Sequence, residues 1–311
     1  MAISKRTGLA FAACLALLHS TAHAEDVAGT LTVAWESFWH QTGFPQAVQK
    51  WNGPIRVKFS GASVARHREF AMRQLREVAE VSGLAISEVA ADDATANLEV
   101  EFVSGLDPLP PNEPCVTTRS WRNFIIQRAK VRVNEQSAWR CMIHEAMHVM
   151  GVPGHPMGNT VLTYFARSDR LTEIDRLLLK TIYSRDVEPG MSPFAVMSIL
   201  AGRLVDAAGD DSKNDTRQAA TAFLLRTVRE MEAFGNGSGE GPAVVLRSGK
   251  ATGAGLARGR TDIQFFLGMA YLNGHIVEPD KGKALEWLGR AAAASHVGAQ
   301  RLLKAASQDG T

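Results

Sequence analysis

The most specific chemical pattern in the sequence is the run His144-Glu145-Ala146-Met147-His148. In a helix, residues four positions apart lie on the same face, so these two imidazoles can hold one Zn²⁺. The glutamate then lies beside the remaining coordination position, where its carboxylate can act as general base towards a water molecule. The alternative is a surface helix with two histidines and a salt-bridged glutamate. The spacing favours the metal site.

A catalytic zinc needs a third protein ligand, and His155 is the leading candidate. It follows Gly151, which can end the helix in a left-handed conformation and turn the chain back towards the metal. The competing candidate is Glu173, although Thr172 and Glu173 also fit the capped start of a helix. A third interpretation leaves His155 as an ordinary loop histidine.

The elements that must position these side chains follow from the apolar patterning. Strands are predicted at residues 55–59, 86–89, 97–103, 123–126 and 130–133. Helices are predicted at residues 64–81, 137–150, 171–183, 194–208, 214–234 and within 261–307. The expected fold class is α+β: a mixed sheet packed on a helix, then the zinc helix and a further helix, followed by an α-helical extension.

The run from His144 to Gly151 is similar to the zinc motif of the metzincin metallopeptidases, and the predicted element order from Trp51 to Tyr183 resembles theirs. The resemblance implies a zinc peptidase domain over residues 25–190, with the third ligand after the glycine turn. Two positions differ from the family pattern. His155 lies seven residues beyond His148 instead of six, and Leu162 stands where the family has a methionine.

The segment from Thr160 to Tyr164 resembles the Met-turn that lies under the metal in metzincins. The resemblance implies that Tyr164 ligates the metal or stabilises an oxyanion; the alternative is a buried aromatic residue with a satisfied hydroxyl. The segment from Leu171 to Ser192 also resembles the end of an uncharacterised family of exported proteobacterial proteins.

The N-terminus predicts export. Residues 1–24 combine Lys5 and Arg6, a short apolar run and an Ala-His-Ala cleavage site, which is typical of a signal peptide. We therefore expect a periplasmic or secreted protein. Cys14 lies in this leader, and the remaining Cys115 and Cys141 are expected to form one disulfide in an oxidising compartment, the alternative being two separate buried thiols.

Composition excludes several classes of protein. The leader holds two of the 34 basic residues and none of the 32 acidic ones, so the mature chain carries 32 of each. This balance, without a basic stripe, argues against a nucleic-acid partner. No apolar stretch approaches the roughly 20 residues that span a bilayer. The 45% of hydrophobic residues is enough for a substantial core.

The C-terminal part predicts a helical extension: a connector over 191–234, a flexible Gly-rich linker over 235–260 and a repeat module over 261–311. The small residues around Gly268 and Gly274, followed by Trp287 and Leu288, resemble the Sel-one-like repeat, a helical hairpin related to tetratricopeptide repeats. The resemblance implies a protein partner at this module; the alternative is a capping helical bundle without a partner.

Three functions are therefore expected from the sequence. The first is a zinc metallopeptidase acting on a protein or peptide, with His144, His148 and His155 as ligands and Glu145 as general base. The second is a binding protein of the cell envelope that retains a relict or structural metal site. The third is a zinc amidase acting on cell-wall peptides, which shares the metal chemistry and differs only in its substrate.

Overall fold

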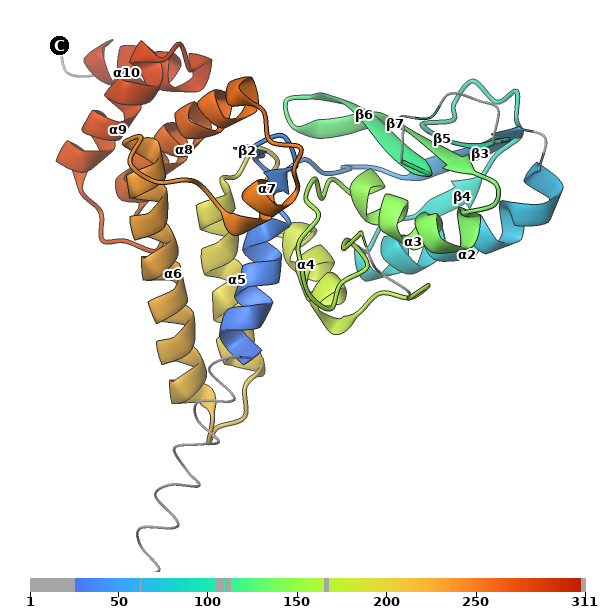
Figure 1. Cartoon of the computed structure of the whole chain (residues 1–311), viewed down its shortest axis with the longest axis horizontal. Helices are drawn as coiled ribbons and strands as arrows, with labels where there is room; N and C mark the ends of the chain where they lie inside the picture. Colours follow the sequence, from blue (N-terminus) through green and yellow to red (C-terminus); the bar gives the residue numbers. More distant parts are fainter. Residues whose placement is uncertain (1–25, 62, 105–108, 110–112, 165–167, 309–311) are drawn as a thin grey trace, which may run out of the picture.

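A mixed β-sheet with helices on one face forms one half of the molecule, and helices with a short two-stranded hairpin form the other half (Figure 1). This is a computed structural model that describes residues 26–61, 63–104, 109, 113–164 and 168–308. The architecture agrees with the predicted α+β class and helical extension. The predicted signal peptide, with Cys14, lies outside the described residues.

The sheet has five strands in the order β4-β3-β5-β7-β6. Only β6 runs antiparallel to its neighbour, and the other pairs are parallel. The strands are β3 (Ile55–Gly61), β4 (Ile86–Glu88), β5 (Leu98–Val103), β6 (Cys115–Arg122) and β7 (Ile125–Asn134). β6 therefore forms one edge of the sheet.

Alternating side chains give the sheet one apolar and one charged face. The apolar face, which includes Val57, Val100 and Val131, is fully buried beneath α2 (Val64–Val81) and α3 (Ala138–Val149). The opposite face carries a ladder of ion pairs: Lys130 Nζ lies 3.3 Å from Glu99 Oε1 and 2.9 Å from Glu101 Oε2. The sheet therefore presents one side to solvent and uses the other to hold α3.

The last two strands differ from the prediction. The segments 123–126 and 130–133 were expected to be separate strands, but both fall in a hairpin whose second strand is β7. Its turn is formed by Asn123 and Phe124, with φ angles of 50° and 63°. β6 has no alternating apolar pattern because it is an edge strand with many exposed side chains, so it was missed.

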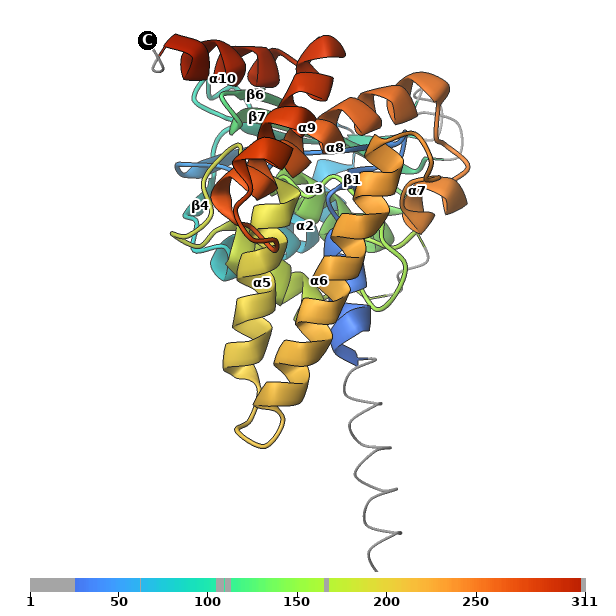
Figure 2. The same ribbon diagram turned by 90° about the vertical axis from the view of Figure 1, so that its left-hand side faces the viewer.

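The helical half packs against the sheet half through one continuous hydrophobic core that runs from Val27 to Trp287. A helix over residues 26–36 lies beside the antiparallel pair α5 and α6 (Figure 2). Trp35 of that helix stacks on Phe194 with ring centroids 5.3 Å apart. The helices after the sheet are α4 (Glu173–Ile182), α5 (Pro193–Ala207), α6 (Lys213–Gly235), α7 (Ala243–Arg247), α8 (Gly253–Asn273), α9 (Lys281–Ala293) and α10 (Val297–Gln308).

The segment 235–260 was expected to be a flexible linker, and this prediction is wrong. It contains α7 and the first turns of α8. Its glycines serve close packing: a Cβ on Gly255 would lie 1.9 Å from the Thr42 carbonyl oxygen, and one on Gly259 would lie 2.1 Å from that of Gly43. Thr42 and Gly43 belong to the turn between β1 (Trp39–His40) and β2 (Phe44–Pro45). The glycine content therefore reflects contact between backbones.

None of the helices in the described part of the chain is long and apolar enough to cross a membrane.

Candidate metal centre

The centre is built on α3, whose sequence places two histidines one turn apart. His144 and His148 lie on the same face, and the helix ends just before Gly151, which has a φ angle of 97°. A Cβ at Gly151 would lie 1.9 Å from the Gln49 carbonyl oxygen, so the sharp turn needs glycine. The predicted role of Gly151 as the helix-ending residue is confirmed.

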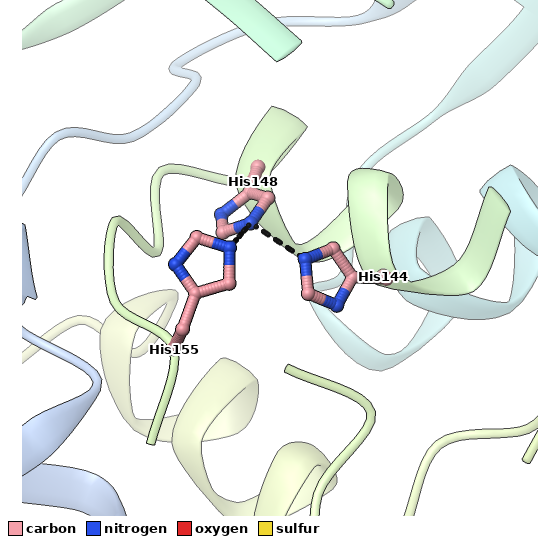
Figure 3. A group of neighbouring side chains, drawn as sticks. All are labelled: His144, His148 and His155. Atoms are coloured by element: carbon pink, nitrogen blue, oxygen red, sulfur yellow. Dashed lines mark hydrogen bonds between the residues drawn. The ribbon is translucent and has the colours of Figure 1, made fainter. Parts of the chain in front are cut away.

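The loop after Gly151 brings His155 back to the two helix histidines (Figure 3). The Nε2 atom of His148 lies 3.1 Å from Nε2 of His144 and 3.1 Å from Nε2 of His155. The loop is held by the end of the 26–36 helix, because the Gly154 N–H donates to the Ser37 carbonyl at 2.9 Å. These three histidines are the one group among the described residues with the geometry to hold a metal ion.

Backbone carbonyls fix the tautomer of both helix histidines. His144 Nδ1 lies 2.8 Å from the Val161 carbonyl oxygen, and His148 Nδ1 lies 2.7 Å from that of Val152. A carbonyl oxygen only accepts, so each Nδ1 must carry the proton. The two Nε2 atoms therefore direct unprotonated lone pairs at each other, an arrangement that a bound cation stabilises.

The electrostatics keep all three rings neutral. Burial lowers the pKa of His144, lowers that of His148 well below its usual value, and lowers that of His155 to about 2. The neighbouring imidazoles lower the pKa of His148 and His155 further. Neutral imidazole is the form that binds a metal, so the three rings are prepared as ligands.

The residues fit a tetrahedral metal ion. Two nitrogens at 2.0–2.1 Å from Zn²⁺ in tetrahedral geometry lie about 3.3 Å apart, close to the observed separations. Nδ1 of His155 is buried without a hydrogen-bond partner in the described structure, so this ring is held by its other contacts. Three nitrogen ligands leave a fourth position for water.

Glu145 is buried beside the triad and faces the edge strand β6. Its side chain is 4% exposed, and its Oε2 accepts a hydrogen bond of 2.6 Å from the Thr117 hydroxyl. Burial raises the pKa of Glu145 to about 7, while the Thr117 hydrogen bond opposes the rise. A carboxyl group with this pKa can exchange a proton near neutral pH.

Tyr164 packs against the triad without being buried. Its ring stacks on that of His155 with centroids 4.3 Å apart and planes inclined by 4°. The side chain is 48% exposed, and its hydroxyl donates a hydrogen bond to Gln41 Oε1. The structure therefore does not bury Tyr164 as the alternative required, and it places the ring directly against His155.

The turn that resembles a Met-turn lies under His144 and is fastened to α4. Leu162 is fully buried, and Val161 supplies the carbonyl that holds His144. Asp175 accepts hydrogen bonds from the Thr160 hydroxyl at 2.5 Å and from the Val161 N–H at 3.1 Å. Asp175 also completes a capping box with Thr172. One buried carboxylate thus supports both the turn and the helix start.

Glu173 is not one of the residues whose ligand atoms lie close enough together to hold a metal ion. It is exposed and begins α4 directly after the capping Thr172. The sequence interpretation of this segment as a capped helix start is confirmed.

Cys115 and Cys141 form the expected disulfide, with their Cα atoms 6.2 Å apart. Cys115 begins β6, and Cys141 lies one turn before His144. The bond ties the edge strand to the helix that carries the histidines.

Several residues around the centre were not found from the sequence. Arg119 is partly buried and donates a hydrogen bond to the His148 carbonyl. Glu36, which is 3% exposed, accepts hydrogen bonds from the Met157 N–H at 3.1 Å and from Arg247 Nη2 at 2.8 Å. Lys250 lies near Tyr164. Each of these contacts joins segments far apart in the chain, so no local sequence pattern predicts it.

Comparison with known proteins identifies the C-terminal helices. Residues 262–296 match the Sel1 repeat family. This range covers most of α8 and all of α9, and such repeats typically mediate protein interactions. No match to this chain was found among curated proteins or among solved structures.

Proposed function

We propose that the protein is an exported zinc-dependent metallopeptidase with His144, His148 and His155 as metal ligands. The observation that carries the proposal is the convergence of the three Nε2 atoms, with the Nδ1 protons of both α3 histidines directed away to backbone carbonyls. The similarity of the motif and the element order to metzincins supports a peptidase of this kind.

Zinc, when bound, supplies a Lewis acid that acidifies water and polarises a peptide carbonyl. The chain supplies proton transfer and orientation. Glu145 accepts the proton of the attacking water and passes it to the leaving amine, which suits a group with a pKa of about 7. Thr117 holds Oε2 of Glu145 and so fixes the direction of the second carboxylate oxygen. Tyr164 stabilises the charge that develops on the carbonyl oxygen.

The edge strand supports a peptide substrate. Within the described residues β6 pairs only with β7, so its outer backbone groups can add an extended peptide as a further strand. Thr117 of β6 touches Glu145, so a peptide on this edge would pass beside the general base.

Replacing Glu145 with glutamine tests the mechanism. The zinc-loaded Glu145→Gln variant is expected to keep its metal and to lose at least about a hundredfold of the peptide hydrolysis, because proton transfer is lost while the ligands remain. Hydrolysis is followed by mass spectrometry on a peptide library that includes cell-wall peptides, which separates the peptidase from the amidase. The matched control is Glu173→Gln, an exposed carboxamide substitution that should leave the rate unchanged. Full activity in Glu145→Gln would refute the mechanism.

The second candidate is a binding protein of the cell envelope with a structural metal site. The Sel1 repeat favours this function, because such repeats typically mediate protein interactions. This function predicts a metal ion whose four coordination positions are all filled and which carries no exchangeable water. The peptidase instead requires one open position on the metal ion. Displacement of water by a hydroxamate, a small metal-chelating group, distinguishes the two.

We also propose that the protein works in the periplasm or outside the cell. The leader-like N-terminus and the Cys115–Cys141 disulfide both support an oxidising compartment.

A further inference from the structure

The connection between α7 and α8, which belongs to the helical extension, reaches the candidate metal centre. Nζ of Lys250 lies 5.2 Å from the centre of the Tyr164 ring, whose other neighbour in the stack is His155. One aromatic ring therefore separates a cation of the extension from a proposed metal ligand.

The backbone around Lys250 is anchored on both sides. The Thr252 N–H donates to the Thr42 carbonyl at 3.1 Å, and the Ser248 hydroxyl donates to the Gln41 carbonyl at 3.1 Å. Gln41 is the residue that accepts the hydrogen bond of the Tyr164 hydroxyl. These contacts anchor the backbone on both sides of Lys250 to the turn that also holds Tyr164.

Lys250 already holds a carboxylate. It forms an ion pair with Glu113, which lies two residues before the start of β6. The side chains of Lys250 and Glu113 are 38% and 28% exposed, so a ligand can reach both.

A carboxylate of a ligand could take the place of Glu113 at small cost. Ion pairs that remain partly accessible to solvent contribute little to stability, so the internal pair does not hold Lys250 strongly. Replacement would also leave Lys250 with a carboxylate partner. Lys250 therefore combines access to solvent, an anchored backbone and an existing carboxylate partner close to Tyr164.

We propose that Lys250 is a specificity-determining residue, which binds a carboxylate of an acidic peptide substrate in the place that Glu113 occupies in this structure. The inference rests on the proposed peptidase function and adds the substrate class. The inference also means that a residue of the helical extension contacts the substrate. This role is separate from any binding of a protein partner by the Sel1 repeat.

Binding of two matched probe series to the zinc-loaded mature chain, residues 25–311, tests the inference. One series is the monohydroxamates of succinic, glutaric and adipic acid, and the other is the uncharged hydroxamates of the same chain lengths. Titration calorimetry gives the affinity of each. The series of lengths allows the carboxylate to reach Lys250 from the metal. We expect at least one carboxylate probe to bind about fivefold more tightly than its uncharged match.

Four variants assign this preference to Lys250. Lys250→Met should reduce it to parity, Lys250→Glu should reverse it, and Lys250→Arg should retain it. Glu113→Gln should increase it by about twofold to fivefold, because the internal competitor is lost. The matched control is Lys281→Met, an exposed lysine at the start of α9, which should behave as the wild type. Zinc content and circular dichroism verify that each variant is folded.

The two proposals fail in different ways. If the uncharged hydroxamates bind and the carboxylate gives no preference, or if Lys250→Met keeps the full preference, the Lys250 inference is overturned and the metal centre stands. If neither series binds the zinc-treated wild type, the open metal site is refuted and the substrate inference falls with it.

Discussion

The Nδ1 atom of His144 lies 2.8 Å from the carbonyl oxygen of Val161, seventeen residues later in the chain. This contact makes the turn after the histidine loop part of the centre, because it orients the first imidazole and fixes its proton. Asp175 holds this turn in place by accepting hydrogen bonds from Thr160 and Val161. The candidate centre is therefore supported by a chain of hydrogen bonds that ends in the cap of α4.

Removing Asp175 should loosen the centre without touching a ligand. Asp175→Ala leaves the Thr160 hydroxyl and the Val161 N–H as buried donors without their acceptor, and it removes the capping box. We expect a loss of about 2–4 kcal/mol of unfolding free energy and a zinc affinity about 10–100-fold weaker. Urea denaturation and chelator competition measure the two effects. The control is Glu173→Ala, and equal zinc affinity in both variants would contradict the supporting role of Asp175.

Because α8 packs closely on the turn between β1 and β2, we expect alanine substitutions at two of its glycines to affect stability differently. Gly255→Ala would place its Cβ against the Thr42 carbonyl, so we expect a loss of about 1–3 kcal/mol of stability. Gly253, which begins the same helix, has open space around a new Cβ. Gly253→Ala should be neutral or slightly stabilising. Thermal unfolding of both variants checks this, and equal melting temperatures would favour a loosely attached extension.

The disulfide should stabilise the chain of residues 25–311, which lacks the proposed signal peptide. It links Cys115 and Cys141 across 26 residues of sequence, so the double variant Cys115→Ala/Cys141→Ala is expected to lose about 2–4 kcal/mol of unfolding free energy. A thiol assay on the denatured, unreduced wild type should detect no free cysteine. Two reactive thiols per chain would show that the bond does not form.

Asp262 of α8 should make stability depend on pH. Burial raises its pKa to about 6, although Arg258 opposes the rise and His296 lies nearby. The unfolded chain loses this proton at a lower pH than the folded chain, so stability should fall as pH rises from about 4 to 6 and then stay level. The fall should be about 2–3 kcal/mol relative to Asp262→Asn, which cannot ionise. Urea titrations of both proteins across this range measure the difference, and parallel pH profiles would contradict the prediction.

Local patterns of the sequence were sufficient for the helix with two histidines, the glycine that ends it and the disulfide. These features follow from helical periodicity, backbone conformation and cysteine count, which act over short stretches of chain. The edge strand β6 was missed because exposed edge residues carry no apolar alternation. The linker prediction failed because glycine composition is the same for a flexible chain and for close packing of backbones.

The residues around the triad needed tertiary structure. Glu36 accepts a hydrogen bond from the Met157 N–H in the loop after His155, 121 residues later in the chain. Lys250 lies over the ring of Tyr164 but comes from the connection between α7 and α8. Asp175 had a local signal, its capping box with Thr172, but this pattern does not reveal that the same carboxylate also holds the Thr160 turn.

The metal content of residues 25–311, the chain without its proposed signal peptide, measured for the wild type beside His155→Ala, tests the central claim most directly. The account predicts one zinc per wild-type chain and an affinity weakened by more than about 100-fold in the variant, because one of three ligands is lost. Zinc bound equally well by His155→Ala, or no zinc in the wild type after reconstitution, would contradict a centre made by His144, His148 and His155.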